Sequence, residues 1–215
     1  MLYEELFRGL AAARIRYVVV GGVALVLHGV VRFTADLDLL VALDPENLDA
    51  FLEAMEDLGY KPKLPLRAKA FADPQMRAEW KEMRGMQVLT FYHPQRPVEL
   101  VDVFTDEPID FAAVERDKQI FTARGVEIPA ISIPHLKQLK ALSGRPQDLA
   151  DIQARETVWV FKDLPAEVKL DWLEQAVLFV EAFVSPAKRA RWDQRWRRDH
   201  IPVSRGEGGS PTPQR

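Results

Sequence analysis

One stretch, residues 17–41, constrains the fold more than any other part of the chain. It opens with a run of β-branched residues, reaches the pair Gly21-Gly22, and closes on polar residues that alternate with apolar ones. In a β-strand, side chains two positions apart point to the same face. The alternation therefore predicts a half-buried strand over residues 33–43, and it places four polar side chains, counted from the residue before that strand, on one side. These are Arg32, Thr34, Asp36 and Asp38.

Helices and strands alternate over the first 130 residues, and only helices are predicted after that. Apolar spacing predicts helices at residues 2–13, 44–58, 74–84, 111–116, 136–143 and 166–184. Strands are predicted at residues 15–20, 33–43, 86–92, 98–104, 119–122 and 126–133. A loop is predicted at 61–73, and residues 93–97 indicate a hairpin between two strands, with prolines that favour a loose loop.

Composition excludes several classes of protein. With 215 residues, 47% of them hydrophobic and 28% charged, the chain is typical of a globular protein. It has no cysteine, which excludes a disulfide framework and a thiolate metal site. The N-terminus does not resemble a signal peptide, and the longest apolar run, residues 17–27, is too short to span a membrane. We expect a cytoplasmic protein without a membrane partner.

The glycine pair and the acids indicate a site for phosphates and metal. Glycines after a strand let the backbone approach an anion closely. Asp36 and Asp38 lie on one face of one strand with Cα atoms about 6.5 to 7 Å apart, a spacing suited to one or two divalent ions. Asp102, on a later predicted strand, is the candidate for a third carboxylate.

The combination resembles the nucleotidyltransferase superfamily of the DNA polymerase β-like fold, in which Gly-Gly or Gly-Ser is followed by D-x-D and a later strand carboxylate. Two further motifs, His28-Gly29 and the segment 136–151 with sequence LKQLKALSGRPQDLAD, are similar to bacterial AbiEii-type toxins and their stand-alone relatives. The resemblance covers roughly residues 15–155.

The resemblance implies an α+β fold, with a mixed sheet flanked by helices and a helical C-terminal part. The expected organisation is a nucleotidyltransferase core at 1–132, a helical region at 133–203 packed on it, and a disordered tail at 204–215. It also implies an enzyme that transfers a nucleoside monophosphate from an NTP to a hydroxyl of tRNA, a protein or a small molecule. A role in phage defence, or as a toxin with an antitoxin partner, would follow.

By position in these motifs, Asp36, Asp38 and Asp102 would bind Mg²⁺ or Mn²⁺ and form the catalytic set. Asp102 would bind a second ion or act as the base toward the acceptor hydroxyl. Gly21 and Gly22 would approach the phosphates. Lys140, with Lys137, would neutralise the triphosphate, and Arg32 and Thr34 share the face of the acids. Physically, catalysis of this displacement needs positioning and charge neutralisation above all.

Each motif also has a structural interpretation. The glycines could simply end a strand, and Asp36-x-Asp38 could be a solvated edge or the D-x-D of a glycosyltransferase. Arg32 could be only the counter-ion of the acids, and His28 a packing residue. The combination with Asp102 favours an active nucleotidyltransferase over a catalytically degenerate nucleotide- or RNA-binding regulator on the same fold.

Positive charge is concentrated at the C-terminus. Residues 186–215 hold eight Lys or Arg and three Asp or Glu, a local charge of +5 in a chain whose net charge is −3. Trp192 and Trp196 lie among these basic residues, so the segment could grip RNA by charge and stacking. A terminal helix that docks its tryptophans on the core is the alternative, and it is slightly favoured.

Overall fold

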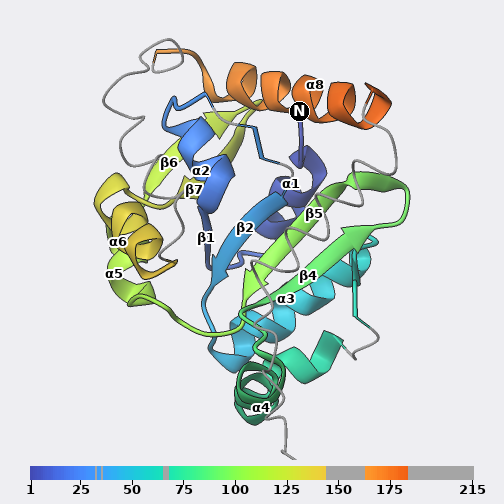
Figure 1. The fold of residues 1–215 in the computed structure, drawn as a ribbon, viewed down its shortest axis with the longest axis vertical. Helices are drawn as coiled ribbons and strands as arrows, with labels where there is room; N and C mark the ends of the chain where they lie inside the picture. Colours follow the sequence, from blue (N-terminus) through green and yellow to red (C-terminus); the bar gives the residue numbers. More distant parts are fainter. Residues whose placement is uncertain (32, 35, 65–67, 144–162, 184–215) are drawn as a thin grey trace, which may run out of the picture.

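The computed structural model describes residues 1–31, 33–34, 36–64, 68–143 and 163–183 (Figure 1). The helices are α1 (Glu4–Ala12), α2 (Gly21–Leu27), α3 (Pro45–Asp57), η1 (Ala68–Ala72, a 3₁₀ helix), α4 (Pro74–Arg84), α5 (Phe111–Arg116), α6 (Ile133–Ser143) and α8 (Ala166–Phe183). The strands are β1 (Tyr17–Val20), β2 (Asp36–Val41), β3 (Lys61–Pro62), β4 (Val88–His93), β5 (Arg96–Phe104), β6 (Gln119–Ala123) and β7 (Val126–Ala130).

The strands form one mixed sheet in the order β3-β4-β5-β2-β1-β7-β6. The central strand, β2, pairs antiparallel with β1 and parallel with β5. The fold is therefore the predicted α+β arrangement of a mixed sheet with flanking helices.

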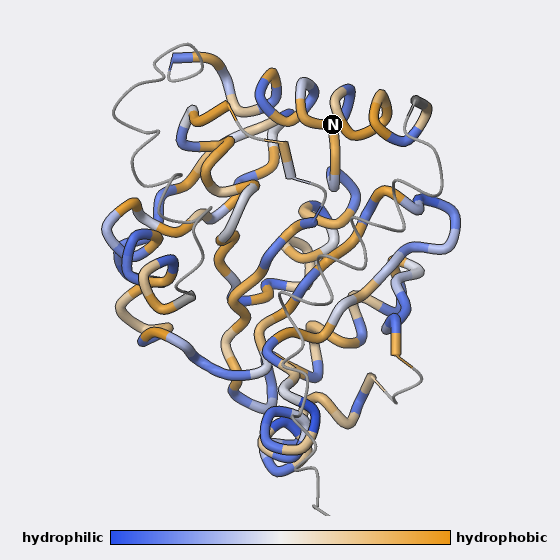
Figure 2. Tube along the Cα trace, viewed as in Figure 1, coloured by the Kyte–Doolittle hydropathy of each residue, from blue (hydrophilic) through white to orange (hydrophobic). Residues whose placement is uncertain are grey.

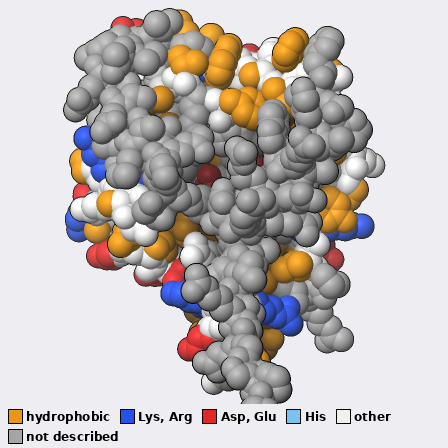
Figure 3. Space-filling view, viewed as in Figure 1, with side chains coloured by type: hydrophobic (Ala, Val, Ile, Leu, Met, Phe, Trp, Pro, Cys, Tyr) orange, Lys and Arg blue, Asp and Glu red, His pale blue; other side chains and the backbone are white. Residues whose placement is uncertain are grey.

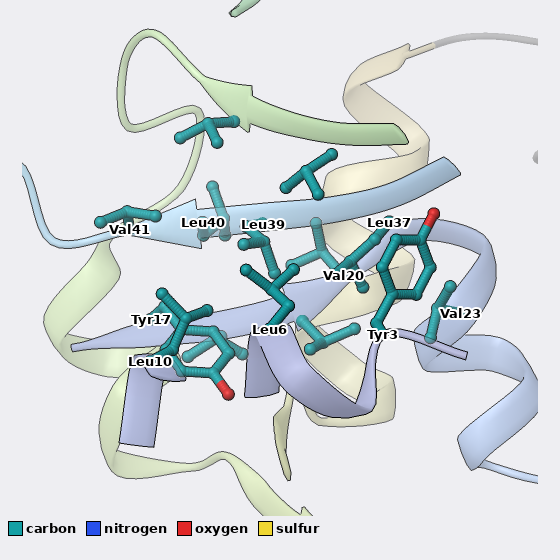
Figure 4. Packing of buried hydrophobic residues seen from close by; sticks show 14 of the residues in the cluster. Tyr3, Leu6, Leu10, Tyr17, Val20, Val23, Leu37, Leu39, Leu40 and Val41 are labelled. Carbon is teal, nitrogen blue, oxygen red and sulfur yellow. The ribbon is translucent and has the colours of Figure 1, made fainter. Parts of the chain in front are cut away.

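Part of the core lies between α1 and one face of the sheet. Leu6 and Leu10 of α1 belong to the same buried cluster as Leu37 and Leu39 of β2, and all four side chains are fully buried (Figure 4). The hydrophobic stretches of the chain are concentrated in the central strands (Figure 2). Because successive side chains of a strand point to opposite faces, Asp36 and Asp38 are turned away from this core.

Local sequence signals fixed several element ends as predicted. The Asp44 side chain caps α3 by accepting from Asn47 N at 3.0 Å, and Gly59 follows that helix with a φ of 83°. Trp80 anchors α4 with only 3% of its surface exposed. These are the helix start and stop that the capping residue and the terminal glycine predict.

Three predictions about strands and loops were wrong. The segment 61–73 contains β3 and η1, because its start pairs with the free edge of β4. Strands β4 and β5 form the predicted hairpin, but their connection is a two-residue turn at Pro94 and Gln95 rather than a loose loop, with a register shift at Tyr92/His93. The strand predicted at 33–43 begins only at Asp36.

Helix α8 buries Leu170, Leu173 and Val177 in the core and is hydrogen-bonded to α2. Lys169 is 3% exposed, and its Nζ donates a hydrogen bond to Leu27 O, at the C-terminal end of α2, at 3.0 Å. Apolar side chains gather on the outer side of α8, where Val168, Leu178 and Phe179 are exposed (Figure 3). Within the described part of the chain, no helix is both long and apolar enough to cross a bilayer. The predicted tail, 204–215, lies outside the described residues, as does the whole of 184–203.

Candidate active site

The register between β2 and β5 brings two of the predicted acids together. Asp38 is the direct partner of Asp102, and Asp36 is the partner of Leu100. Neighbouring strands lie about 4.8 Å apart, so Asp38 and Asp102 are adjacent and point to the same face of the sheet. Asp36 lies two residues before Asp38 on β2 and therefore points to the same face. Both side chains are partly exposed. Acidic atoms are visible in a recess near the middle of this face (Figure 3).

The glycine pair lies directly against the acids. Gly21 has a φ of +63°, and a Cβ added there would stand 1.9 Å from Asp38 Oδ2. A Cβ on Gly22 would stand 2.4 Å from Thr34 Oγ1. Any side chain at Gly21 would therefore displace the Asp38 carboxylate, and its left-handed backbone conformation is one that L-residues rarely adopt. The glycines thus place the start of α2 beside Asp38.

Asp102 has an unusual environment for a carboxylate. It is 3% exposed, and within the described part of the chain its Oδ1 has no hydrogen-bond partner. Burial raises the pKa of Asp102, while a hydrogen bond with the Thr90 side chain and the charge of Lys63 act in the opposite direction. A buried carboxylate oxygen without a partner costs stability, which is typical of a group kept for function.

One residue predicted to share the acid face does not lie on the strand. Thr34 precedes β2, and its Oγ1 donates to Asp36 O at 3.4 Å. Val20, the last residue of β1, is the partner of Asp38, and the chain leaves the sheet at Gly21. The first two residues of β2, Asp36 and Leu37, therefore lie beyond the end of β1 and pair with β5. Arg32 lies outside the described residues.

Comparison with protein families is decisive at this point. The model of one family, described as nucleotidyl transferase AbiEii toxin of the type IV toxin–antitoxin systems, matches residues 5–206. The chain belongs to the AbiEii nucleotidyltransferase family. It is accordingly a transferase, and the resemblance based on its glycine pair and acids is confirmed.

Several solved structures are similar to this AbiEii family member. The lincosamide antibiotic adenylyltransferase LnuA with lincomycin bound is 14% identical, with 71% of this chain and 93% of that chain covered and a TM-score of 0.43. ANT(2")-Ia in complex with adenylyl-2"-tobramycin is 16% identical, with coverage of 87% and 97% and a TM-score of 0.43. An antigenic nucleotidyltransferase-like protein from Paracoccidioides brasiliensis is 16% identical, with coverage of 83% and 88% and a TM-score of 0.46. No curated protein matches the chain.

The predicted lysines of this AbiEii family member lie on α6, whose start is held next to the site. Ile131 N, just before α6, donates to Val19 O of β1 at 2.9 Å. The imidazole Nε2 of His28 also lies 2.7 Å from Ile131 O, which gives His28 the packing and hydrogen-bonding role expected of it. Lys140 is 6% exposed, whereas Lys137 is exposed. The second half of the motif at 136–151, from residue 144 onward, lies outside the described residues, as do Trp192 and Trp196.

Two polar residues near the acids escaped the sequence reasoning. Thr90 of β4 is the strand partner of Asp102, and Lys63 follows β3. The alternation within 88–93 is a signal that could have found Thr90 as a polar residue on the acid face. Lys63 gave no such signal, because the two-residue strand before it is too short to show a period.

The acids suit an ion that arrives with its substrate. Within the described residues, no three Asp, Glu, His or Cys side chains form a group that could hold a metal by themselves. Mg²⁺, however, is usually held by one or two carboxylates together with substrate phosphates and water, and not by a cage of protein ligands. The adjacent Asp38 and Asp102, with the unpartnered Oδ1 of Asp102, fit that manner of binding.

Proposed function

We propose that this protein is a Mg²⁺-dependent nucleotidyltransferase that transfers a nucleoside monophosphate from an NTP to a hydroxyl acceptor such as tRNA, a protein or a small molecule. One observation carries the proposal. The start of α2 at Gly21, the Asp38 carboxylate and the buried Asp102 carboxylate lie side by side, in that order, across three neighbouring strands of the sheet.

The glycine side of the acids suits the phosphates. Gly21 presents backbone in place of a side chain next to Asp38, and Gly22 does so next to Thr34, which would let a phosphate approach the main chain closely. Lys140, with Lys137, would supply positive charge from α6, which begins beside β1. In phosphoryl transfer, neutralising and positioning charge is most of what the protein contributes.

The acids suit the metal. Asp36 and Asp38 would hold Mg²⁺ or Mn²⁺ from β2, and Asp102 would contribute from β5. Bound there, the divalent ion would withdraw charge from the reacting phosphate and orient it for an in-line displacement. The ligands would be fixed by the hydrogen bonds of the sheet, which requires little reorganisation during the reaction.

Asp102 also suits the role of general base. Burial raises the pKa of this carboxyl above its ordinary value, which makes the carboxylate a better proton acceptor than an exposed aspartate. It would take the proton of the attacking hydroxyl as the oxygen attacks the α-phosphorus and pyrophosphate departs. Thr90 would orient it through their hydrogen bond.

The test is label transfer. The purified protein is incubated with Mg²⁺, each α-labelled NTP in turn and total cell extract, and the class of molecule that takes up label is identified. Asp38→Asn and Asp36→Ala serve as loss-of-site controls, and EDTA as the metal control. If the wild-type protein showed neither nucleotide binding nor label transfer, this result would contradict the proposal. It would favour a catalytically degenerate binding protein.

The description of the AbiEii family as type IV toxins supports a further part of the proposal, that the activity is toxic and is countered by an antitoxin. Induced expression of the wild-type chain in a bacterial host should arrest growth, and expression of Asp38→Asn at the same level should not. Equal growth of the two strains would contradict the toxin role and leave the proposed transferase activity untouched.

A further inference from the structure

The strand register places four polar residues in one row across the sheet. Asp38 pairs with Asp102, and Asp102 pairs with Thr90. The next pairs along β4 are Pro62 with Phe91 and Lys61 with Tyr92. Lys63 N donates to Thr90 O at 2.8 Å, which continues the pairing one residue beyond β3 and makes Lys63 the partner of Thr90.

Residues paired directly across neighbouring strands share a face of the sheet. The row Lys63, Thr90, Asp102 and Asp38 therefore lies on the face of the acids, opposite the core. The charge of Lys63 is felt at Asp102, whose carboxyl it helps to keep ionised. The Lys63 side chain is itself exposed, so it can meet a ligand from solvent.

The row has two ends with different chemistry. Gly21 adjoins Asp38 on the side of β1, and Lys63 stands at the other end, beyond β4. In phosphoryl transfer the attacking and leaving oxygens lie roughly in line on opposite sides of the phosphorus. If the leaving pyrophosphate occupies the glycine side of the acids, the attacking hydroxyl must come from the side of Thr90 and Lys63.

We propose that Lys63 contacts the acceptor and binds a phosphate group next to its reacting hydroxyl. This inference rests on the proposed function, because the acceptor side is defined by where the nucleotide lies. A lysine ammonium binds phosphate as a point charge, and its distance along the row from Asp102 leaves room for the hydroxyl between them. Lys63 would thus select acceptors that carry phosphate over neutral ones.

The test separates acceptor binding from nucleotide binding. Two probes are titrated onto the protein with Mg²⁺ and a saturating non-hydrolysable NTP analogue: a short labelled oligoribonucleotide with a free 3′ hydroxyl, and glycerol 1-phosphate. The first carries phosphodiesters and the second a phosphate monoester, so the pair shows which source of phosphate the site accepts. The variants are Lys63→Gln and Lys63→Arg, with Lys69→Gln as the matched control, since Lys69 is an exposed lysine of η1 outside the row.

At least one probe should bind the wild type, and Lys63→Gln should weaken that binding about tenfold, the effect of losing roughly 1.4 kcal/mol. The Kd of the NTP analogue should stay unchanged, Lys63→Arg should retain most of the binding, and Lys69→Gln should behave as wild type. For the oligoribonucleotide, the slope of log K against log salt should fall by about 0.7, as for one lost phosphate contact on a single strand.

The proposal is overturned if neither probe binds the wild type, if Lys63→Gln binds both probes as the wild type does, or if it weakens the NTP analogue instead. These readouts need no turnover. If the probes bind in a Lys63-dependent way but no label is transferred, the proposed reaction is contradicted and the anion site at Lys63 is supported. If label is transferred equally well without Lys63, the reaction is supported and the role of Lys63 is contradicted.

Discussion

Replacing Asp102 by asparagine should have opposite effects on the stability of the fold and on the transfer activity. The carboxylate is buried, and its Oδ1 has no partner among the described residues. An unsatisfied buried polar group costs about 1–3 kcal/mol, and more when it is charged. Asparagine removes the charge but keeps one unpartnered polar atom. We therefore expect the free energy of unfolding to rise by about 1 kcal/mol at neutral pH, or about 2–4 °C in Tm for a chain of this length.

The pH dependence of this gain has a definite sign. Burial raises the folded-state pKa of Asp102 above the unfolded value. Below the unfolded pKa, about 3.9, the residue is protonated in both states and wild type and variant should be equally stable. As pH rises from the unfolded pKa through the folded pKa, the wild type must keep a buried charge and loses stability, so the advantage of Asp102→Asn should grow over that interval and level off above it.

The assay is urea unfolding in EDTA across that pH range, with Asp49→Asn, an exposed position of α3, as the surface control. The control should change stability by less than about 0.5 kcal/mol. Adding Mg²⁺ with an NTP analogue should raise the Tm of the wild type more than that of Asp102→Asn, and transfer should fall by about 100-fold or more. A variant that unfolds more easily than wild type at neutral pH would refute the reasoning, because Asp102 would then be a structural residue.

The remaining predictions concern two glycines and a buried lysine. Gly125→Ala should cost about 1–2 kcal/mol for its left-handed backbone and leave transfer intact, since an added Cβ meets nothing within 4 Å. Gly21→Ala carries the same backbone cost and also displaces Asp38, so it should be less stable than Gly125→Ala and inactive, as compared by unfolding and label transfer. Lys169→Met should lose about 1–3 kcal/mol because Leu27 O loses its buried donor; Lys137→Met, at an exposed position, should not. Burial also lowers the pKa of Lys169, so the stability of the wild type should rise as pH approaches the ordinary lysine value of about 10.4 and the charge is lost.

Elements with strong local signals were predictable from the sequence. Helix α3 is one, since Asp44, Pro45 and Gly59 mark its two ends. Features that depend on a partner strand were not. The first residues of β2 lie beyond the end of β1 and pair with β5, and β3 exists because the edge of β4 is available to it. Neither partner is encoded within the segment itself, so alternation alone predicted one strand too long and missed the other.

The same division applies to the site. Asp36 and Asp38 could be placed on one face from their spacing, because the two-residue period of a strand is local. That Asp102 adjoins Asp38, and that Thr90 and Lys63 complete the row, depends on three registers between strands. A slip of one residue in any of them would turn the residues beyond it to the core face. The buried leucines on the core side of β2 oppose such a slip, so the packing of α1 against Leu37 and Leu39 is also what holds the acids on the opposite face.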